Sequence, residues 1–172
     1  GVETENYEVT SSNAAVVTVE NGVAKLVGNG SANIVVSYNG STLVEIPVSV
    51  VAYTGIYNRE QFEAIFNNQS GKYMLMNDLD FQGATHYAFG SWKFGHDNQA
   101  YAFKGVFDGN GHAIKNVVIG VDNRHDAVQT DASIFGTVFG TVRNLAVINA
   151  TVTNRGGVIA SGIGNGGKIE NC

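Results

Sequence analysis

The sequence predicts an all-β protein in two parts, a small antiparallel β-sandwich followed by a solenoid of stacked parallel strands. In the first third of the chain, Asn-Gly pairs separate short apolar runs. In the last third, an apolar residue, a variable residue and an Asn recur at a nearly fixed spacing. β-branched residues and Gly dominate both parts, which favours strands over helices.

Composition narrows the classes of function. The chain has 172 residues, enough for one or two domains, and 44% of them are hydrophobic, which is ample for a core. Only 15% are charged and the net charge is −5, so nucleic acid is not expected as a partner. No apolar run reaches the roughly 18 residues that span a membrane. The single Cys, Cys172, excludes an internal disulfide framework and a Cys-based zinc site.

Residues 1–53 are predicted to form the sandwich. Asn-Gly fits the two positive-φ positions of a type I′ turn, so each pair indicates a hairpin. The pairs are Asn21-Gly22, Asn29-Gly30 and Asn39-Gly40, and the flanking strands are expected at Val16–Val19, Val23–Val27 and Ile34–Tyr38. The alternating residues Thr42, Val44, Ile46, Val48 and Val50 then put one face of a further strand on a core. Pro47 lies on the opposite face and cannot donate to a ladder, so this strand is expected at a sheet edge.

The segments from Ser11 to Val19 and from Asn21 to Val35 resemble the group 2 bacterial immunoglobulin-like domain, and the match covers roughly Tyr7–Val51. This resemblance implies an immunoglobulin-like β-sandwich. The opening strands usual in that family are missing, so the module is expected to be incomplete. Either another segment or chain supplies the missing strands, or the chain begins within the domain.

The second domain is expected at 54–172, after a junction near Ala52–Ile56, and begins with a short capping helix near 59–69. Asn58 followed by Gln61 has the form of a capping box, and Ser70-Gly71 would end the helix. An apolar stripe at helical spacing is formed by Phe62, Ile65 and Phe66. The end of a solenoid exposes unpaired backbone and apolar side chains, and an amphipathic helix can cover both.

Three Asn mark the repeat of the solenoid. Asn116, Asn144 and Asn171 are 28 and 27 residues apart, and a fixed period of this length is the signature of stacked structural repeats. Neighbouring strands lie about 4.8 Å apart, which places equivalent positions over one another. The three Asn are therefore predicted to form one hydrogen-bonded ladder. By the same register, Cys172 is expected in the apolar column of Val117 and Leu145.

The repeats also resemble a known family. The motifs are FxGxFDGxGHxIxN from Phe103, FGxxxGxVxNLxV from Phe135 and GxxxGGxIxNC from Gly162. Over Ile56–Cys172, with Tyr73–Phe81 as the first strand, they are similar to the GLUG-motif repeats of bacterial surface proteins. The resemblance implies a right-handed parallel β-helix on an exported protein. It implies no single activity, because function lies in sites rather than in folds.

The residues between Gln82 and Ala102 interrupt the repeat and are rich in aromatic side chains. Exposed rings could stack on sugar faces, and polar neighbours could bond sugar hydroxyls. The candidate ligand-binding residues are Tyr87, Trp92, Asp97, Asn98 and Tyr101. The alternative is that the rings fold inward and cover the flank of the solenoid.

Other polar groups have both a functional and a structural interpretation. Asp78 and Asp80 share one strand face and could act in acid–base chemistry or hold Ca²⁺, but without a nearby basic partner a solvated outer face is favoured. The turn at Asp108-Gly109-Asn110-Gly111 could bind Ca²⁺ but lacks further acidic ligands, and positive φ explains it. The His residues lack metal-ligand spacing and are expected on the surface; they are His86, His96, His112 and His125. We therefore expect no catalytic residue, no metal and no cofactor.

The sequence thus predicts a non-catalytic bacterial protein, secreted or on the cell surface, that serves adhesion, glycan binding or display. Its expected partner is a glycan or another host-surface ligand. A polysaccharide-degrading β-helix lyase or hydrolase is the alternative, and a structural module of a fibre or virion surface is a third interpretation. If the chain ends at Cys172, the uncapped last repeat is expected to pair with another copy.

Overall fold

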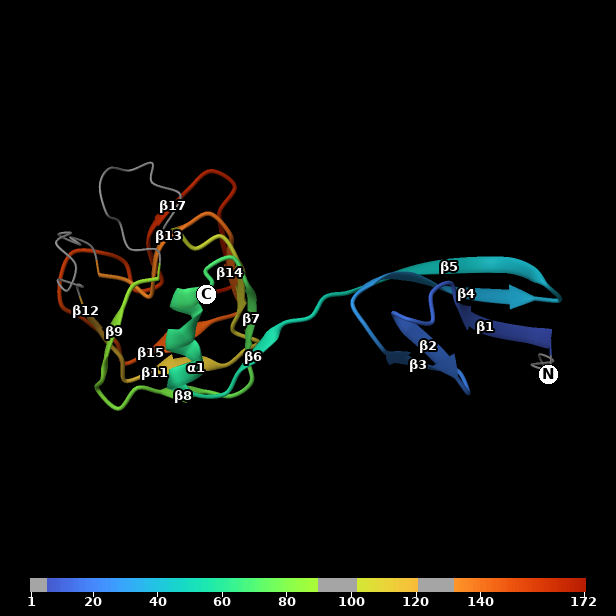
Figure 1. Cartoon of the computed structure of the whole chain (residues 1–172), viewed down its shortest axis with the longest axis horizontal. Helices are drawn as coiled ribbons and strands as arrows, with labels where there is room; N and C mark the ends of the chain where they lie inside the picture. Colours follow the sequence, from blue (N-terminus) through green and yellow to red (C-terminus); the bar gives the residue numbers. More distant parts are fainter. Residues whose placement is uncertain (1–5, 90–101, 121–131) are drawn as a thin grey trace. The chain divides into compact units, whose positions relative to one another are not determined.

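The computed structural model describes residues 6–89, 102–120 and 132–172, and β-strands dominate them (Figure 1). The chain divides into two compact units, Gly1–Ala52 and Tyr53–Cys172. The division falls one residue before the boundary expected from the sequence. The all-β class is confirmed, with a single short α-helix among the described residues.

The first unit contains two sets of antiparallel strands. β4 (Gly30–Tyr38) pairs with β1 (Tyr7–Ser11) and with β5 (Ser41–Val50), while β2 (Val17–Glu20) pairs with β3 (Val23–Leu26). Two of the predicted hairpin turns form as expected. Asn21 and Gly22 have φ of 52° and 75°, and Asn39 and Gly40 have φ of 48° and 74°, the positive values that a type I′ turn requires.

The third Asn-Gly pair, Asn29-Gly30, is not a hairpin. It connects β3 to β4, which lie in different sheets, and Gly30 has φ of 135°. Pro47 is placed as predicted, because β5 is an edge strand of its sheet.

The predicted core face of β5 is only partly covered. The buried residues of this unit are Val16, Val17 and Ala32, and Ile34, Val48 and Val50 pack against them. Val44 and Ile46 were expected on the core but are 47% and 50% exposed. The reason is that the contacts of Val16 and Val17 reach only the Val48 end of this ten-residue strand.

The second unit is built from parallel sheets that the chain visits repeatedly (Figure 1). The largest sheet has the order β18-β14-β10-β7-β6. Its strands are β6 (Thr54–Ile56), β7 (Lys72–Leu75), β10 (Val106–Asp108), β14 (Thr141–Arg143) and β18 (Lys168–Glu170). The second sheet contains β8 (Leu79–Asp80), β11 (Ala113–Lys115) and β15 (Ala146–Ile148), and the third contains β9 (Thr85–Tyr87), β12 (Val118–Gly120) and β16 (Thr151–Val152). In the fourth, β13 (Phe135–Val138) pairs with β17 (Ala160–Ile163). Each pass of the chain therefore adds strands to successive sheets, and equivalent residues stack.

The short helix forms from the capping signal that the sequence contains. α1 (Arg59–Glu63) begins after Asn58, whose Oδ1 accepts from the backbone N–H of Gln61 at 2.9 Å. Gln61 Oε1 in turn accepts from the backbone N–H of Tyr57 at 2.7 Å. The predicted capping box therefore forms in its first half only, because the return bond reaches the residue before the N-cap and not Asn58 itself. A 3₁₀ turn, η2 (Ala64–Asn67), follows. The element thus ends at Asn67, two residues before the expected end.

The predicted apolar stripe is correct for two of its three residues. Phe62 and Ile65 are buried, but Phe66 is 54% exposed. The backbone tightens to three residues per turn after Glu63, which moves Phe66 off the face that an α-helix would have buried. Phe62 packs against aromatic rings in the core of the second unit, with centroid distances of 5.0 Å to Phe89 and 5.6 Å to Phe107.

A column of Gly holds successive passes in close contact. A Cβ on Gly105 would lie 2.0 Å from the carbonyl oxygen of Gly71, and a Cβ on Gly140 would lie 1.9 Å from that of Gly105. Real Cβ atoms cannot occupy such positions. Gly is therefore required where the backbone of one pass crosses directly over the next.

Candidate functional site

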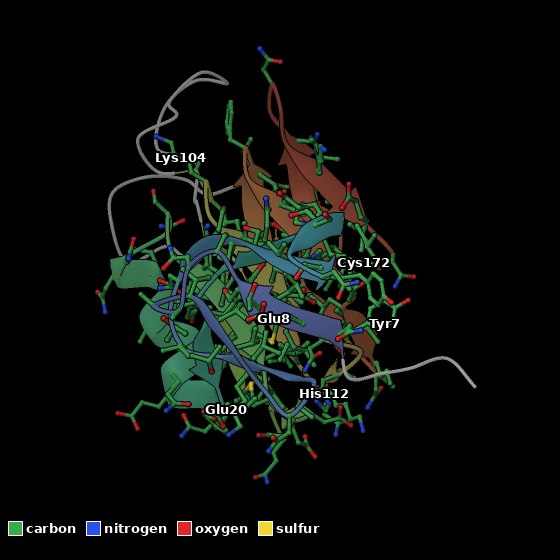
Figure 2. All side chains as sticks on the ribbon, turned by 90° about the vertical axis from the view of Figure 1, so that its right-hand side faces the viewer. Tyr7, Glu8, Glu20, Lys104, His112 and Cys172 are labelled. Carbon is green, nitrogen blue, oxygen red and sulfur yellow. The ribbon has the colours of Figure 1, made fainter. Side chains whose placement is uncertain are left out.

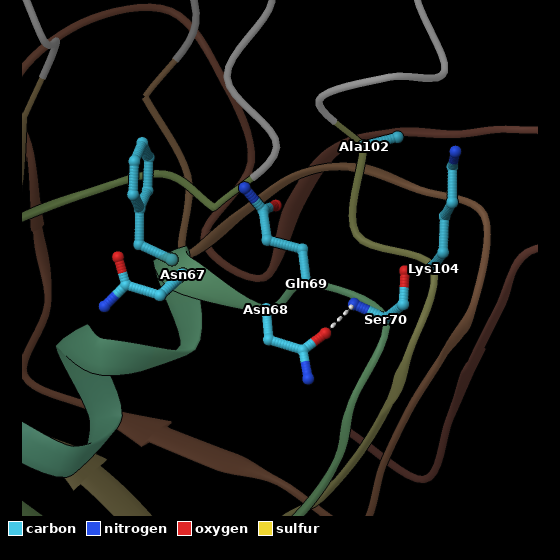
Figure 3. Close-up of a pocket in the computed structure, with 7 residues that line it drawn as sticks. Asn67, Asn68, Gln69, Ser70, Ala102 and Lys104 are labelled. Atoms are coloured by element: carbon cyan, nitrogen blue, oxygen red, sulfur yellow. Dashed lines mark hydrogen bonds between the residues drawn. The ribbon is translucent and has the colours of Figure 1, made fainter.

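The described residues form a pocket between the end of η2 and the segment that leads into β10 (Figure 3). Its volume is about 430 Å³, at the smaller end of the range for small-ligand sites. The lining residues are Phe66, Asn67, Asn68, Gln69, Ser70, Ala102 and Lys104. Aromatic, amide, hydroxyl and ammonium groups thus meet at one place.

The two sides of the pocket are joined through backbone hydrogen bonds. The carbonyl oxygen of Gln69 accepts from the backbone N–H groups of Lys104 and Gly105, each at 2.9 Å. Gln69 and Lys104 are therefore neighbours on adjacent passes of the chain, although 35 positions separate them in the sequence. Their side chains extend toward the same side (Figure 3).

Asn68 holds the backbone of the pocket rim in a tight turn. Its Oδ1 accepts from the backbone N–H of Ser70 at 3.3 Å, the bond that is dashed in Figure 3. Its carbonyl oxygen accepts from the Tyr73 hydroxyl at 2.5 Å and from the N–H of Gly71 at 3.2 Å. Burial raises the pKa of Tyr73, so this hydroxyl keeps its proton and remains a donor.

Two polar groups of the pocket are left without a partner. Gln69 Oε1 is buried and accepts no hydrogen bond, a condition that costs about 1–3 kcal/mol in a protein interior. Lys104 is exposed (Figure 2) and forms no ion pair with the part of the chain that the structure describes. A buried acceptor without a donor beside an unpaired cation is the arrangement expected where a polar ligand binds.

Four of the five candidate ligand-binding residues predicted from the sequence lie outside the described residues: Trp92, Asp97, Asn98 and Tyr101. Tyr87 lies in β9, half-buried, opposite Gly120 of β12. The sequence analysis missed the pocket itself, although the polar run from Asn67 to Ser70, between the helix and the first strand of the repeat, was a visible signal.

Asp78 and Asp80 are exposed on the outer face, and the alternating residues Leu79 and Phe81 are buried, as the structural interpretation predicts. The expectation that no basic residue lies nearby is wrong. Lys115 of β11 forms an ion pair with Asp78, because parallel stacking brings the next pass alongside.

A hydrogen bond from Lys115 and one from the backbone N–H of Ala113 lower the pKa of Asp78 to about 2. A hydrogen bond from Asn116 and one from the N–H of Gln82 lower the pKa of Asp80.

The three Asn do not form the single ladder that was predicted. Asn171 Nδ2 donates to Asn144 Oδ1 at 2.9 Å, and Asn144 Nδ2 donates to Asp108 Oδ1 at 3.0 Å. Asn116 belongs to a second ladder, in which Asn149 Nδ2 donates to Asn116 Oδ1 at 2.6 Å. Asn116 follows β11, which is in the second sheet, whereas Asn144 and Asn171 follow β14 and β18, which are in the first.

Both ladders occupy corners where the backbone turns between sheets. Their four Asn have φ between 51° and 54°, the left-handed conformation that Asn tolerates better than most residues. Asn149 was missed in the sequence analysis, although Val147-Ile148-Asn149 has the same apolar-x-Asn pattern.

The predicted surface positions can be checked for His86 and His112, whereas His96 and His125 lie outside the described residues. His112 is partly exposed, as predicted, but His86 is fully buried. It faces Glu63 Oε1 at 3.3 Å through Nδ1 and the carbonyl oxygen of Ile134 at 3.0 Å through Nε2. The predicted column of Val117, Leu145 and Cys172 does not form, because Val117 follows Asn116 of one ladder, whereas Leu145 and Cys172 follow Asn144 and Asn171 of the other. Cys172 is exposed, and β18 before it is the outermost strand of its sheet.

The turn at Asp108 uses its carboxylate for structure. Asp108 accepts from the N–H of Asn110, from Asn144 and from Arg143, and Asn110 and Gly111 have φ of 52° and 78°. Within residues 6–89, 102–120 and 132–172, no three His, Cys, Asp or Glu side chains are grouped closely enough to hold a metal ion.

Comparison of the chain with protein-family models, with curated proteins and with solved structures finds no match. Among the described residues, no helix has the length and apolar character needed to cross a membrane.

Proposed function

We propose that the second unit is a right-handed parallel β-helix and that the first is a partial immunoglobulin-like sandwich. The parallel pairing in all four sheets of the second unit supports the first assignment, and connections between parallel strands of one sheet are almost always right-handed. The two antiparallel sheets of the first unit, with a small core between Val16, Val17 and Ala32, support the second.

We further propose that the chain is a non-catalytic bacterial protein, secreted or on the cell surface, that binds a glycan for adhesion or display. The observation that carries this proposal is the buried, unpartnered Gln69 Oε1 in a pocket lined by amides and by the half-exposed Phe66. Sugars present hydroxyl donors around an apolar ring face. They match both an acceptor that lacks a donor and an exposed aromatic ring.

The electrostatics of the outer face favour binding over glycoside cleavage. A general acid needs a raised pKa so that it keeps a proton near neutral pH. Asp78 and Asp80 instead have lowered pKa values, so both carboxylates stay ionised. We expect no release of reducing or unsaturated ends from pectin, alginate or glycosaminoglycans. Turnover that Asp78→Asn or Asp80→Asn abolishes would overturn the non-catalytic proposal.

A glycan array with the whole chain tests the binding proposal, followed by titration of the best oligosaccharide against variants. Gln69→Leu should weaken binding by about 5- to 30-fold, the effect of about 1–2 kcal/mol, because it removes the acceptor. The same change should leave the fold as stable as before or more stable, because it also removes a buried unpaired group. A residue with only a structural role would not combine these two effects.

Asn67→Ala, also in the pocket, should weaken binding, whereas Asn165→Ala is a matched control at an exposed position outside it. The proposal fails if no glycan is bound, or if binding is unchanged in both Gln69→Leu and Asn67→Ala.

A further inference from the structure

The charge of the pocket points to a more specific ligand, an inference that rests on the proposed glycan binding. Lys104 is the only ionisable side chain among the seven lining residues. Two lysines of the described chain have carboxylate partners, Lys25 with Glu20 and Lys115 with Asp78. Lys72, Lys104 and Lys168 form no ion pair with the described residues, and of these three only Lys104 lines the pocket. Within the described residues no carboxylate pairs with Lys104, so its ammonium group is available to an anionic ligand.

Gln69 restricts the ligand in a different way. Its buried Oε1 requires a hydrogen-bond donor, and an ionised carboxylate, sulfate or phosphate has acceptors only. A simple anion would satisfy Lys104 and leave Gln69 unpaired. A neutral sugar would satisfy Gln69 and leave Lys104 without a counter-charge.

The two groups are close enough to act on one ligand. The backbone N–H of Lys104 donates to the carbonyl oxygen of Gln69 at 2.9 Å, so the side chains start from adjacent passes that lie about 4.8 Å apart. Figure 3 shows both side chains extending toward the same side. We propose that this pocket binds a carboxylate-bearing sugar, with its carboxylate on Lys104 and a hydroxyl donating to Gln69 Oε1.

The pocket also offers complementary groups for the rest of such a sugar. The amides of Asn67 and Asn68 can bond further hydroxyls. The Oδ1 of Asn68 holds the turn, and its Nδ2 donates to no group in the described part of the chain. Phe66 is exposed and can cover an apolar ring face. A uronic acid combines the three features: a carboxylate, hydroxyl donors and a C–H face.

The test compares three short oligosaccharides of equal length by calorimetric titration: oligogalacturonate, its methyl ester and the corresponding neutral galactose oligomer. Oligogalacturonate should bind about tenfold more tightly than the other two, because it alone forms a charge-assisted hydrogen bond. Added salt should weaken its binding and leave the neutral oligomers unaffected.

Variants assign the preference to Lys104. Lys104→Gln should reduce binding of oligogalacturonate to the level of the methyl ester, and Lys104→Arg should retain the preference. Lys168→Gln is the matched control, an exposed lysine in β18 outside the pocket, and should change nothing. Because Lys104 is exposed, none of these variants should alter the melting temperature.

The outcomes separate this inference from the proposed function. Equal binding of acidic and neutral oligomers, or an effect of Lys168→Gln equal to that of Lys104→Gln, would overturn the acidic-sugar assignment while glycan binding stands. If none of the three oligomers binds and the glycan array is also blank, both proposals fall. If the array reveals a neutral ligand only, the acidic assignment alone is wrong.

Discussion

Asp108 of β10 and Arg143 of β14 form an ion pair across two stacked passes, with Arg143 Nε 2.8 Å from Asp108 Oδ2. The Asp108 side chain is only 6% exposed, whereas that of Arg143 is 39% exposed. Arg143 also donates to the Tyr53 hydroxyl at 3.1 Å. The pair therefore connects strands of the large sheet to the residue that begins the second unit.

Asp108→Ala should destabilise the second unit by about 1–3 kcal/mol. The value lies below that for a fully buried pair because Arg143 is partly solvated. Urea unfolding measures the change. Lys115→Gln breaks the more exposed Lys115–Asp78 pair and is the matched control, with an expected cost below about 1 kcal/mol. Equal costs for the two variants would contradict the structural role of Asp108.

The stability of the chain should fall in acid through its paired carboxylates. Burial alone would raise the pKa of Asp108, but hydrogen bonds from Asn144, from the N–H of Asn110 and from Arg143 outweigh it, and the net pKa is lowered. A group with a lowered pKa in the folded state contributes stability above its unfolded value, here 3.8, and loses it as pH falls through the folded value.

The difference in unfolding free energy between the wild type and Asp108→Asn should therefore shrink below pH 3.8, because protonation makes Asp108 resemble Asn. Urea unfolding at several pH values measures this difference. A difference that stays constant well below pH 3.8 would show that the carboxylate charge of Asp108 is not the stabilising feature.

The corner Asn residues should be replaced more easily by Gly than by Ala. Asn144 has φ of 53° and hydrogen bonds to both Asp108 and Asn171. Asn144→Gly loses only the side-chain bonds, whereas Asn144→Ala adds about 1–2 kcal/mol of left-handed strain. Thermal unfolding of the two variants gives the comparison, and an Ala variant as stable as the Gly variant would contradict the assigned backbone conformation.

The Gly column should tolerate no side chain. Gly140→Ala places a Cβ 1.9 Å from the carbonyl oxygen of Gly105, so adjacent passes must separate, and we expect a loss of more than about 3 kcal/mol or no folded protein. Gly83→Ala is the control, because its Cβ would meet nothing within 4 Å and only its φ of 80° is unfavourable. Its expected cost is about 1–2 kcal/mol. Similar costs at both positions would refute the proposed backbone contact.

His86 should stabilise the contact between the helix and the sheets. His86→Leu removes two hydrogen-bonding contacts of the buried ring, one to Glu63 and one to the carbonyl oxygen of Ile134, which still accepts from the backbone N–H of Phe89. At about 0.5–1.5 kcal/mol for each hydrogen bond, the expected cost is about 1–3 kcal/mol. His112→Leu, at a partly exposed site, should change stability by less than about 1 kcal/mol. Chemical denaturation distinguishes the two, and a neutral His86→Leu would show that these hydrogen bonds contribute nothing.

Local signals in the sequence predicted the elements well. Asn58 with Gln61 located the helix start, two Asn-Gly pairs located hairpins, and Pro47 located an edge strand. Each of these depends on φ preferences or on hydrogen bonds within a few residues, so neighbouring residues determine the outcome. The helix end was less predictable, because the change to 3₁₀ geometry exposed Phe66.

The register of the repeat was not predictable from spacing alone. Val106 pairs with Thr141, 35 positions on, and Thr141 pairs with Lys168, only 27 positions on. Because the passes differ in length, the regular spacing of Asn116, Asn144 and Asn171 did not reflect their positions in the fold. Asn116 lies at the second corner of one pass, and Asn144 lies at the first corner of the next pass, so their separation in the sequence is not the length of one complete pass.

The sequence by itself determined where the chain turns, where it forms strands and where Gly or Asn is needed, because these properties follow from the conformational preferences of single residues. The tertiary structure alone decided which groups meet. Asp108 with Arg143, His86 with the Ile134 carbonyl, and Gln69 with Lys104 are each separated by more than 30 positions. Their contacts depend on the stacking of one pass on the next, and that stacking depends on the length of every connection between them.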